Sequence, residues 1–135
     1  MTYSHILIVN PTKFLGNLLI ALGLLQKACS EFDSRAQPYT IILDESFRPL
    51  VNDLFKPKNI IYYPLSALKK ASFTVKAKLY TSLLSDIRSL KAQQAVDLEG
   101  DSVSRMLTLL SGAKQRIGPE DCPRTNWYHQ LSTPR

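Results

Sequence analysis

The sequence has little of several things that define special protein classes. Its 135 residues include two cysteines, Cys29 and Cys122, which are too few and too far apart for a disulfide framework or a metal-ligand spacing. We predict two reduced thiols, as in a cytoplasmic protein. The two histidines, His5 and His129, have no cysteine or histidine nearby in the sequence, so no metal site is expected.

Long apolar runs and nucleotide-binding motifs are also missing. The longest apolar run, from Phe14 to Leu25, covers about a dozen residues, whereas a membrane-spanning helix needs about 20. The start of the chain lacks the basic region of a secretory signal. Residues 10–17, NPTKFLGN, hold one glycine where a dinucleotide fingerprint has three, and neither a P-loop nor a GxSxG serine motif occurs.

What the sequence does contain is an alternation of strand-like and helix-like segments. This pattern predicts one α/β domain, a Rossmann-like parallel sheet with helices on both faces, over residues 1–118, and an irregular tail over 119–135. The helix after the first strand is apolar on nearly every face, so we expect it to be covered on both sides. The predicted strands are 5–10, 38–44, 60–64, 93–100 and 114–118, and 65–72 is a predicted polar connection. The predicted helices are 17–32, 45–55, 73–91 and 101–113, with Gly112 expected to stop the last one.

Ligands of such sheets bind at the carboxyl ends of the strands. There, NPTKFLGN places backbone N–H groups and a helix N-terminus, expected to be capped by Asn17, where an anion or hydroxyl group could bind. The alternative is a plain strand-to-helix connection, which the turn alone favours slightly.

The DLEGD segment supplies Asp97, Glu99 and Asp101 at the end of the fourth strand. Strand alternation would send Asp97 and Glu99 to the same side, so two carboxylates could meet near a ligand. Alternatively, Asp101 or Ser102 only caps the next helix and Glu99 is only solvated. Spacing alone favours this second interpretation.

The net charge of +6 favours an anionic partner. Lys69, Lys70, Lys76 and Lys78 form a basic cluster, with Asp86 the single acid of the helix that follows. A solvated helix face is the common explanation, and contact with an anionic substrate or lipid surface is the alternative. Nucleic acid is not expected, because aromatic residues do not alternate with the lysines in a series of stacking platforms.

Three segments together resemble the heptosyltransferase-like glycosyltransferases of glycosyltransferase family 9. ILIVNPTKFLGNLLIALGLLQ resembles the family's opening strand, its turn ending in Gly-Asp, and its apolar helix. AVDLEGDSVSRMLTLLSGAKQRIG resembles a second signature, a strand ending in Asp-Leu-Gln-Gly followed by a helix and a Gly-Ala-Lys-x-Arg-Ile-Gly-like segment. NWYHQLSTPR is similar to the aromatic and basic stretch that often follows.

The resemblance implies a GT-B architecture with this chain as the N-terminal, acceptor-binding half. The nucleotide-sugar donor, commonly ADP-heptose, would bind a C-terminal half, so no cofactor is expected on this chain. The implied acceptor is an acidic, phosphorylated glycolipid, the inner core of lipopolysaccharide. The expected location is cytoplasmic and peripheral on the inner membrane. With the strand-end argument, the expected substrate contacts are Asn10, Thr12, Lys13, Gly16, Lys69, Lys70, Lys76 and Gly100.

The chain departs from the family pattern at two points. Asn17 stands where the family has its proposed base, an aspartate, and the preceding turn is one residue longer. An amide cannot take a proton from a hydroxyl at neutral pH, so either Asp97, Glu99 or Asp101 replaces the base or the domain is inactive. In addition, no donor domain follows residue 135, so we expect the chain to be incomplete as a transferase.

Two other readings stay open. The first is a non-catalytic binding or assembly module that keeps the Rossmann-like shell, forms a homo-oligomer and covers an apolar face with a second copy. The second is a flavodoxin-like or response-regulator domain. That reading is weakened because Asn10 and Pro11 follow the first strand, where an acidic phosphoacceptor cluster would be needed.

Overall fold

The computed structural model describes residues 5–55, 59–119 and 130–132. In chain order the elements are β1 Ile6–Val9, α1 Leu15–Ser34, β2 Tyr39–Asp44, the 3-10 helix η1 Glu45–Phe47, α2 Arg48–Val51, β3 Ile60–Tyr63, α3 Leu65–Lys70, α4 Phe73–Ser89, β4 Gln94–Asp97, α5 Ser102–Leu110, β5 Gln115–Pro119 and β6 Gln130–Ser132. No helix in these ranges is both long enough and apolar enough to cross a membrane.

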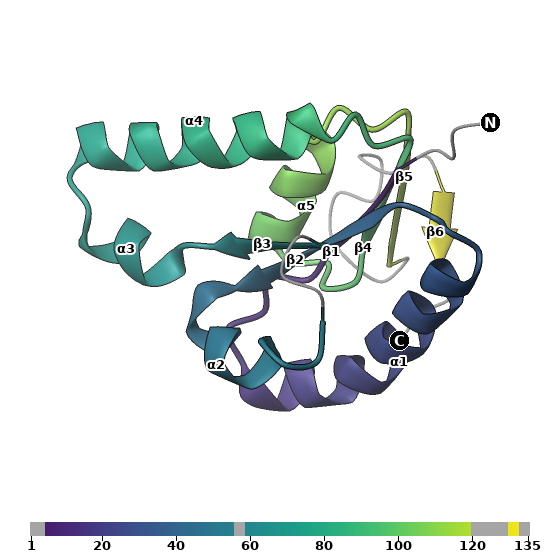
Figure 1. Ribbon diagram of the computed structural model, residues 1–135. Helices are drawn as coiled ribbons and strands as arrows, with labels where there is room; N and C mark the ends of the chain where they lie inside the picture. Colours follow the sequence, from purple (N-terminus) through teal and green to yellow (C-terminus); the bar gives the residue numbers. More distant parts are fainter. Residues whose placement is uncertain (1–4, 56–58, 120–129, 133–135) are drawn as a thin grey trace.

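The strands form one parallel sheet in the order β3-β2-β1-β4-β5-β6. Ile8 of β1 lies opposite Ile41 of β2 on one side and Val96 of β4 on the other. Helices α1 and α2 lie on one face of the sheet and α4 and α5 on the other (Figure 1). The predicted Rossmann-like α/β fold is therefore confirmed. Strands β2 and β3 are added on one side of β1, whereas β4, β5 and β6 are added on the other. The boundary between β1 and β4 is therefore a topological switch point, and parallel α/β sheets bind ligands at such points.

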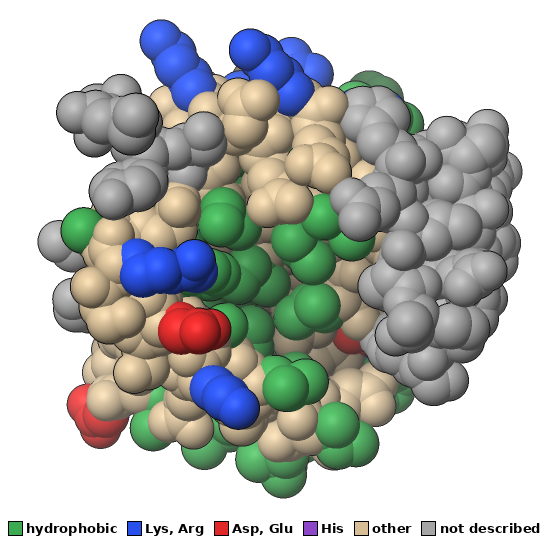
Figure 2. Space-filling model, turned by 90° about the vertical axis from the view of Figure 1, so that its right-hand side faces the viewer, with side chains coloured by type: hydrophobic (Ala, Val, Ile, Leu, Met, Phe, Trp, Pro, Cys, Tyr) green, Lys and Arg blue, Asp and Glu red, His purple; other side chains and the backbone are tan. Residues whose placement is uncertain are grey.

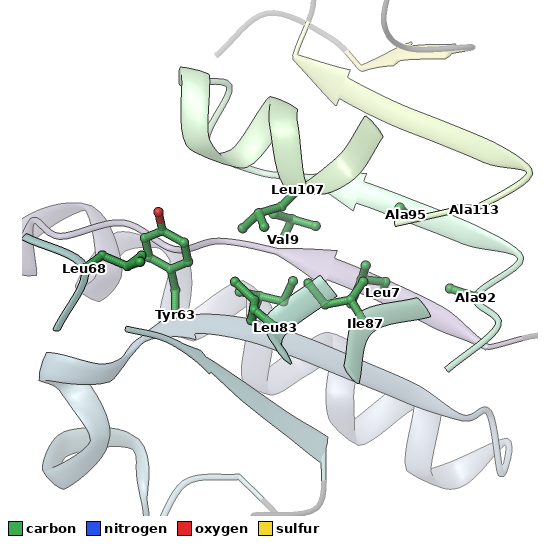
Figure 3. Packing of buried hydrophobic residues seen from close by; sticks show 11 residues of the cluster. Leu7, Val9, Tyr63, Leu68, Leu83, Ile87, Ala92, Ala95, Leu107 and Ala113 are labelled. Atoms are coloured by element: carbon green, nitrogen blue, oxygen red, sulfur yellow. The ribbon is translucent and has the colours of Figure 1, made fainter. Parts of the chain in front are cut away.

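Each face of the sheet has its own core, because side chains alternate along a strand. On the α4–α5 side, Leu7 and Val9 pack with Ile87 and Leu107 (Figure 3). Tyr63 places its ring in this cluster, and its hydroxyl points away from the apolar side chains. On the other side, one set of buried residues links β1, β2 and β3 to α1 and α2: Ile8, Leu18, Leu22, Leu25, Cys29, Ile41, Leu43, Val51, Phe55 and Ile60.

One histidine and one cysteine lie within the described residues. Nε2 of His5, at the start of β1, lies 2.8 Å from Oγ1 of Thr40 in β2. Cys29 is a free and buried thiol whose pKa is raised by burial. Cys122 and His129 lie outside the described residues, so the structure does not test the predictions for them.

Four local predictions were wrong. Helix α1 begins at Leu15, so Asn17 is its third residue and caps nothing. The same helix is covered on one side only, since Ile20 and Leu24 are 79% and 72% exposed. Residues 65–70 form the short helix α3 where a polar connection was expected. Strand β6, at residues 130–132, lies within the stretch predicted to be irregular.

Candidate functional site

The loop after β1 carries buried polar groups to the carboxyl edge of the sheet. Asn10 is 2% exposed, and its backbone N–H donates to the carbonyl oxygen of Ile42. Within the described residues, Nδ2 of its side chain has no hydrogen-bond partner. Thr12 is also buried, and its Oγ1 accepts the N–H of Phe14 at 3.3 Å. This loop therefore holds one buried donor, the Asn10 amide, that no described residue satisfies.

Helix α1 starts directly from this loop without a side-chain cap. The residue before its first turn, Phe14, makes no capping hydrogen bond. The first N–H groups of an α-helix have no partner within the helix and carry a partial positive charge. Gly16 and Asn17, both exposed, lie in this turn. A hydroxyl or an anionic group of a ligand could accept these N–H groups.

The loop after β4 is held by two of its own carboxylates. Oδ1 of Asp97 accepts the N–H groups of Glu99 and Gly100, both at 2.9 Å. Gly100 has φ +77°, a conformation that favours glycine. Asp101 caps α5, since its Oδ1 accepts the N–H of Ser104 at 2.8 Å. The strand alternation predicted to continue from Asp97 to Glu99 is replaced by this turn, because β4 ends at Asp97.

Two cavities open at this edge, and Glu99 lines both. The larger, of about 490 Å³, lies at the switch point, beside the ends of β1 and β4 and the first half of α1. The smaller, of about 190 Å³, lies on the other side of Glu99. The larger is lined by Asn10, Asn17, Ile20, Ala21, Leu24, Leu98 and Glu99, and the smaller by Pro11, Lys13, Phe14, Tyr63, Leu65, Glu99, Asp101, Ser102 and Val103.

Tyr63, the last residue of β3, lines the smaller cavity and was not among the predicted site residues. The hydroxyls of Tyr63 and Tyr80 lie 3.0 Å apart. Burial is the largest cause that raises the pKa of Tyr63. The hydrogen bond with Tyr80 and the negative charges of Asp101 and Asp44 raise this pKa further, so Tyr63 stays neutral. Asp44 is 3% exposed; its Oδ1 accepts the N–H of Ser46, while its Oδ2 has no partner in the described part of the chain. A signal was present, since Asp44 ends a predicted strand and the carboxyl ends of parallel strands share one edge of the sheet.

The structure brings together some predicted residues and separates others. Asn10, Asn17 and Glu99 share the larger cavity, and Lys13 shares the smaller one with Glu99 and Asp101. The exposed lysines of the basic cluster, at the end of α3 and the start of α4, line neither cavity. Thr12 and Gly100, which were predicted to contact substrate, make hydrogen bonds within their own loops. Oγ1 of Thr12 accepts the N–H of Phe14, and the N–H of Gly100 donates to Oδ1 of Asp97.

Comparison with solved structures finds sugar transferases of Escherichia coli. The chain matches the E. coli heptosyltransferase WaaC, solved with ADP-2-deoxy-2-fluoro heptose, with a TM-score of 0.73 and 18% identity over 96% of this chain and 42% of that one. The match to WaaC with ADP has a TM-score of 0.74, 18% identity, and coverages of 96% and 41%. For E. coli ADP-heptose lipopolysaccharide heptosyltransferase II these values are 0.65, 16%, 94% and 34%.

This chain has the fold of a heptosyltransferase region. At 16 to 18% identity the likeness establishes the fold, and the predicted resemblance to heptosyltransferases is confirmed at that level. The chain spans about two fifths of the length of WaaC and about one third of that of heptosyltransferase II. No family model matches the sequence, and no curated protein matches it either.

Proposed function

We propose that this chain is the acceptor-binding domain of a heptosyltransferase-like glycosyltransferase. In a complete enzyme it would work with a donor-binding domain that holds a nucleotide sugar such as ADP-heptose. The observation that carries the proposal is the pair of cavities at the switch point, joined by Glu99, on a heptosyltransferase fold. Amide, carboxylate and ammonium groups there match the hydroxyl and acidic groups of an oligosaccharide acceptor.

Glu99 is the carboxylate best placed to replace the missing aspartate at position 17. Oδ1 of Asp97 is held inside its own turn, and Oδ1 of Asp101 holds the start of α5. Glu99 alone of the three lines the same cavity as Asn17, and it also lines the second one. In this arrangement Asn17 orients an acceptor hydroxyl by hydrogen bonding, and Glu99 takes its proton.

The reaction that this geometry supports is a displacement at the anomeric carbon of the donor sugar. The acceptor oxygen forms a bond to that carbon while the bond to the nucleoside diphosphate breaks, and the diphosphate leaves with the bonding electron pair. The hydroxyl proton passes to the Glu99 carboxylate. The neutral Asn17 amide can assist but cannot accept the proton at neutral pH.

Binding is tested by adding a phosphorylated inner-core oligosaccharide of lipopolysaccharide to the isotope-labelled chain and recording NMR spectra. We expect chemical-shift changes concentrated in residues 10–17 and 97–101. Glu99→Gln should weaken binding by about ten-fold or more, because it removes a charge-assisted hydrogen bond worth about 1.5–3 kcal/mol. Glu31→Gln, near the far end of α1 and exposed, is the matched control and should not change binding. Shifts scattered over the surface, or none at millimolar ligand, would remove the basis of the proposal.

Transfer itself is tested with a donor-binding domain and ADP-heptose supplied. Glu99→Gln should lower the rate by a factor on the order of 10² or more, as for loss of a general base. Asn17→Asp should retain or raise the rate, since it restores the family's carboxylate. A domain that binds acceptor but transfers no sugar, even with Asn17→Asp, supports the second candidate below.

The second candidate is a non-catalytic assembly module that uses the exposed side of α1. Leu15, Leu19, Ile20 and Leu24 are all more than half exposed along the first half of this helix. Figure 2 shows one face of the molecule on which hydrophobic side chains gather at the centre and along the lower edge. Exposed apolar surface of this kind favours contact with another protein surface, and a second copy or a donor domain would meet that need.

A further inference from the structure

The corner between α3 and α4 carries a surface that lies apart from both cavities. All residues from 72 to 78 are exposed, so the first turns of α4 present much of their surface to solvent. Figure 1 shows this end of α4, together with α3, projecting beyond the carboxyl edge of the sheet. A projecting corner can touch a flat surface without interference from the rest of the domain.

Two apolar side chains stand at this corner. Phe73 is 88% exposed, the highest value among the exposed large hydrophobic residues of the described chain, and Val75 is 46% exposed. Ser72 caps the helix here, its Oγ accepting the N–H of Val75 at 3.4 Å, so Phe73 is fixed as the first helical residue. A phenyl ring held in water by an ordered helix start contributes nothing to the core and is available for contact.

Four lysines surround these side chains. Lys69 and Lys70 lie in the last turn of α3, and Lys76 and Lys78 follow Val75 in α4. All four are exposed, and among the described residues no ion pair neutralises any of them. The corner therefore combines the exposed ring of Phe73 with four positive charges that no described acidic residue pairs with.

We propose that the α3–α4 corner docks on an anionic lipid bilayer, with Phe73 and Val75 entering the interface and the four lysines binding headgroup phosphates. Charge complementarity selects an anionic surface, and the phenyl ring selects a lipid one. A soluble polyanion would use the lysines and leave Phe73 in water, and a nucleic acid would need several stacking rings. This docking does not depend on sugar transfer, although it would hold the two cavities close to a lipid-linked molecule.

Sedimentation with vesicles tests the docking. The chain should bind vesicles of phosphatidylcholine mixed with phosphatidylglycerol, should not bind pure phosphatidylcholine, and should dissociate as salt rises. Phe73→Ser should weaken binding about ten-fold, since it removes most of the inserted apolar surface. Lys76→Gln with Lys78→Gln should weaken it on the order of twenty-fold, at about five-fold for each lysine near the surface.

Matched controls come from the turn after α2 and from α1. Leu54→Ser removes a side chain that is 41% exposed and lines neither cavity at the sheet edge, and Lys27→Gln removes an exposed lysine. Neither should change vesicle binding by more than about two-fold. All these residues are exposed, so circular dichroism should show folded protein throughout.

The proposal is overturned if the anionic vesicles are not bound at low salt, or if Leu54→Ser weakens binding as much as Phe73→Ser. It is also overturned if Phe73→Ser has no effect while soluble heparin competes fully, because the corner is then a polyanion site. Because the vesicles contain no glycosyl acceptor, these outcomes are independent of the acceptor titration.

Discussion

Asp97 shows how one buried carboxylate can organise a whole loop. Its side chain is 2% exposed, and its Oδ1 holds two backbone N–H groups of the turn that positions Glu99. Charge-assisted hydrogen bonds of this kind are stronger than neutral ones. Asp97 therefore shapes the turn on which Glu99 lies.

We expect Asp97→Ala to lower the free energy of unfolding by about 2–4 kcal/mol, because two buried N–H groups lose their acceptor. Asp97→Asn should cost less, since its carbonyl oxygen can still accept. Asp101→Ala serves as the comparison and should cost about 1 kcal/mol for the lost helix cap. Urea unfolding measures all three. An Asp97→Ala variant no less stable than Asp101→Ala would contradict this account of the turn.

His5 makes stability depend on pH in a defined direction. Burial lowers the pKa of His5 below its ordinary value of 6.5 in the folded chain. The unfolded chain therefore binds the proton more readily, and stability should decrease as pH falls below about 6.5. Above that value the contribution is complete.

Urea midpoints measured between about pH 7.5 and about pH 5.5 should decrease toward the acid side. His5→Gln can still hydrogen-bond Thr40 and does not titrate, so its curve should be flatter over this window. An equally steep curve for His5→Gln would assign the dependence to other groups.

At the scale of elements, α1 has two apolar sides, one buried and one exposed. Leu18 and Leu25 are buried against the sheet, whereas Ile20 and Leu24 face outward. The sequence could not separate the two sides, because nearly every position from 18 to 25 is apolar and gives no polar stripe. Only the packing of the helix on β1 and β2 shows which side the core uses.

We expect Leu18→Ala to lower the free energy of unfolding by about 2–5 kcal/mol, as for a cavity in a well-packed core. Ile20→Lys and Leu24→Lys should change it by less than about 0.5 kcal/mol, because their side chains already face solvent. Sedimentation tests the assembly module: wild-type chain should self-associate and the Ile20→Lys, Leu24→Lys double variant should not. A wild-type chain that is strictly monomeric would contradict self-association through α1.

The other elements differ in how well the sequence predicted them. β1 to β5 were predicted from short apolar runs, and the cap at Asp101 and the glycine stop at Gly112, which has φ +78°, were predicted from local chemistry. The start of α1 was not, because Asn17 is a good capping residue that lies two positions inside the helix. Strand β6 was missed, since three residues carry no periodicity of their own and are a strand only through pairing with β5.

At the scale of the whole molecule, only part of the candidate site could be predicted from the sequence. Asn10, Asn17 and Glu99 could be placed at one edge from sequence, since the carboxyl ends of parallel strands meet there. Ile20 and Leu24 could not. They reach the larger cavity because one side of α1 stays open, and local spacing does not encode that relation.

The sequence by itself determined the α/β alternation, the polar strand ends and the absence of an aspartate at position 17, because these depend on residue types and their order. Only the tertiary structure decided which of the three carboxylates shares a cavity with Asn17, because β4 ends at Asp97 and the turn that follows carries Glu99. The exposure of Phe73 among four lysines was decided in the same way. A side chain's surroundings depend on contacts between distant segments, and those exist only once the chain has folded.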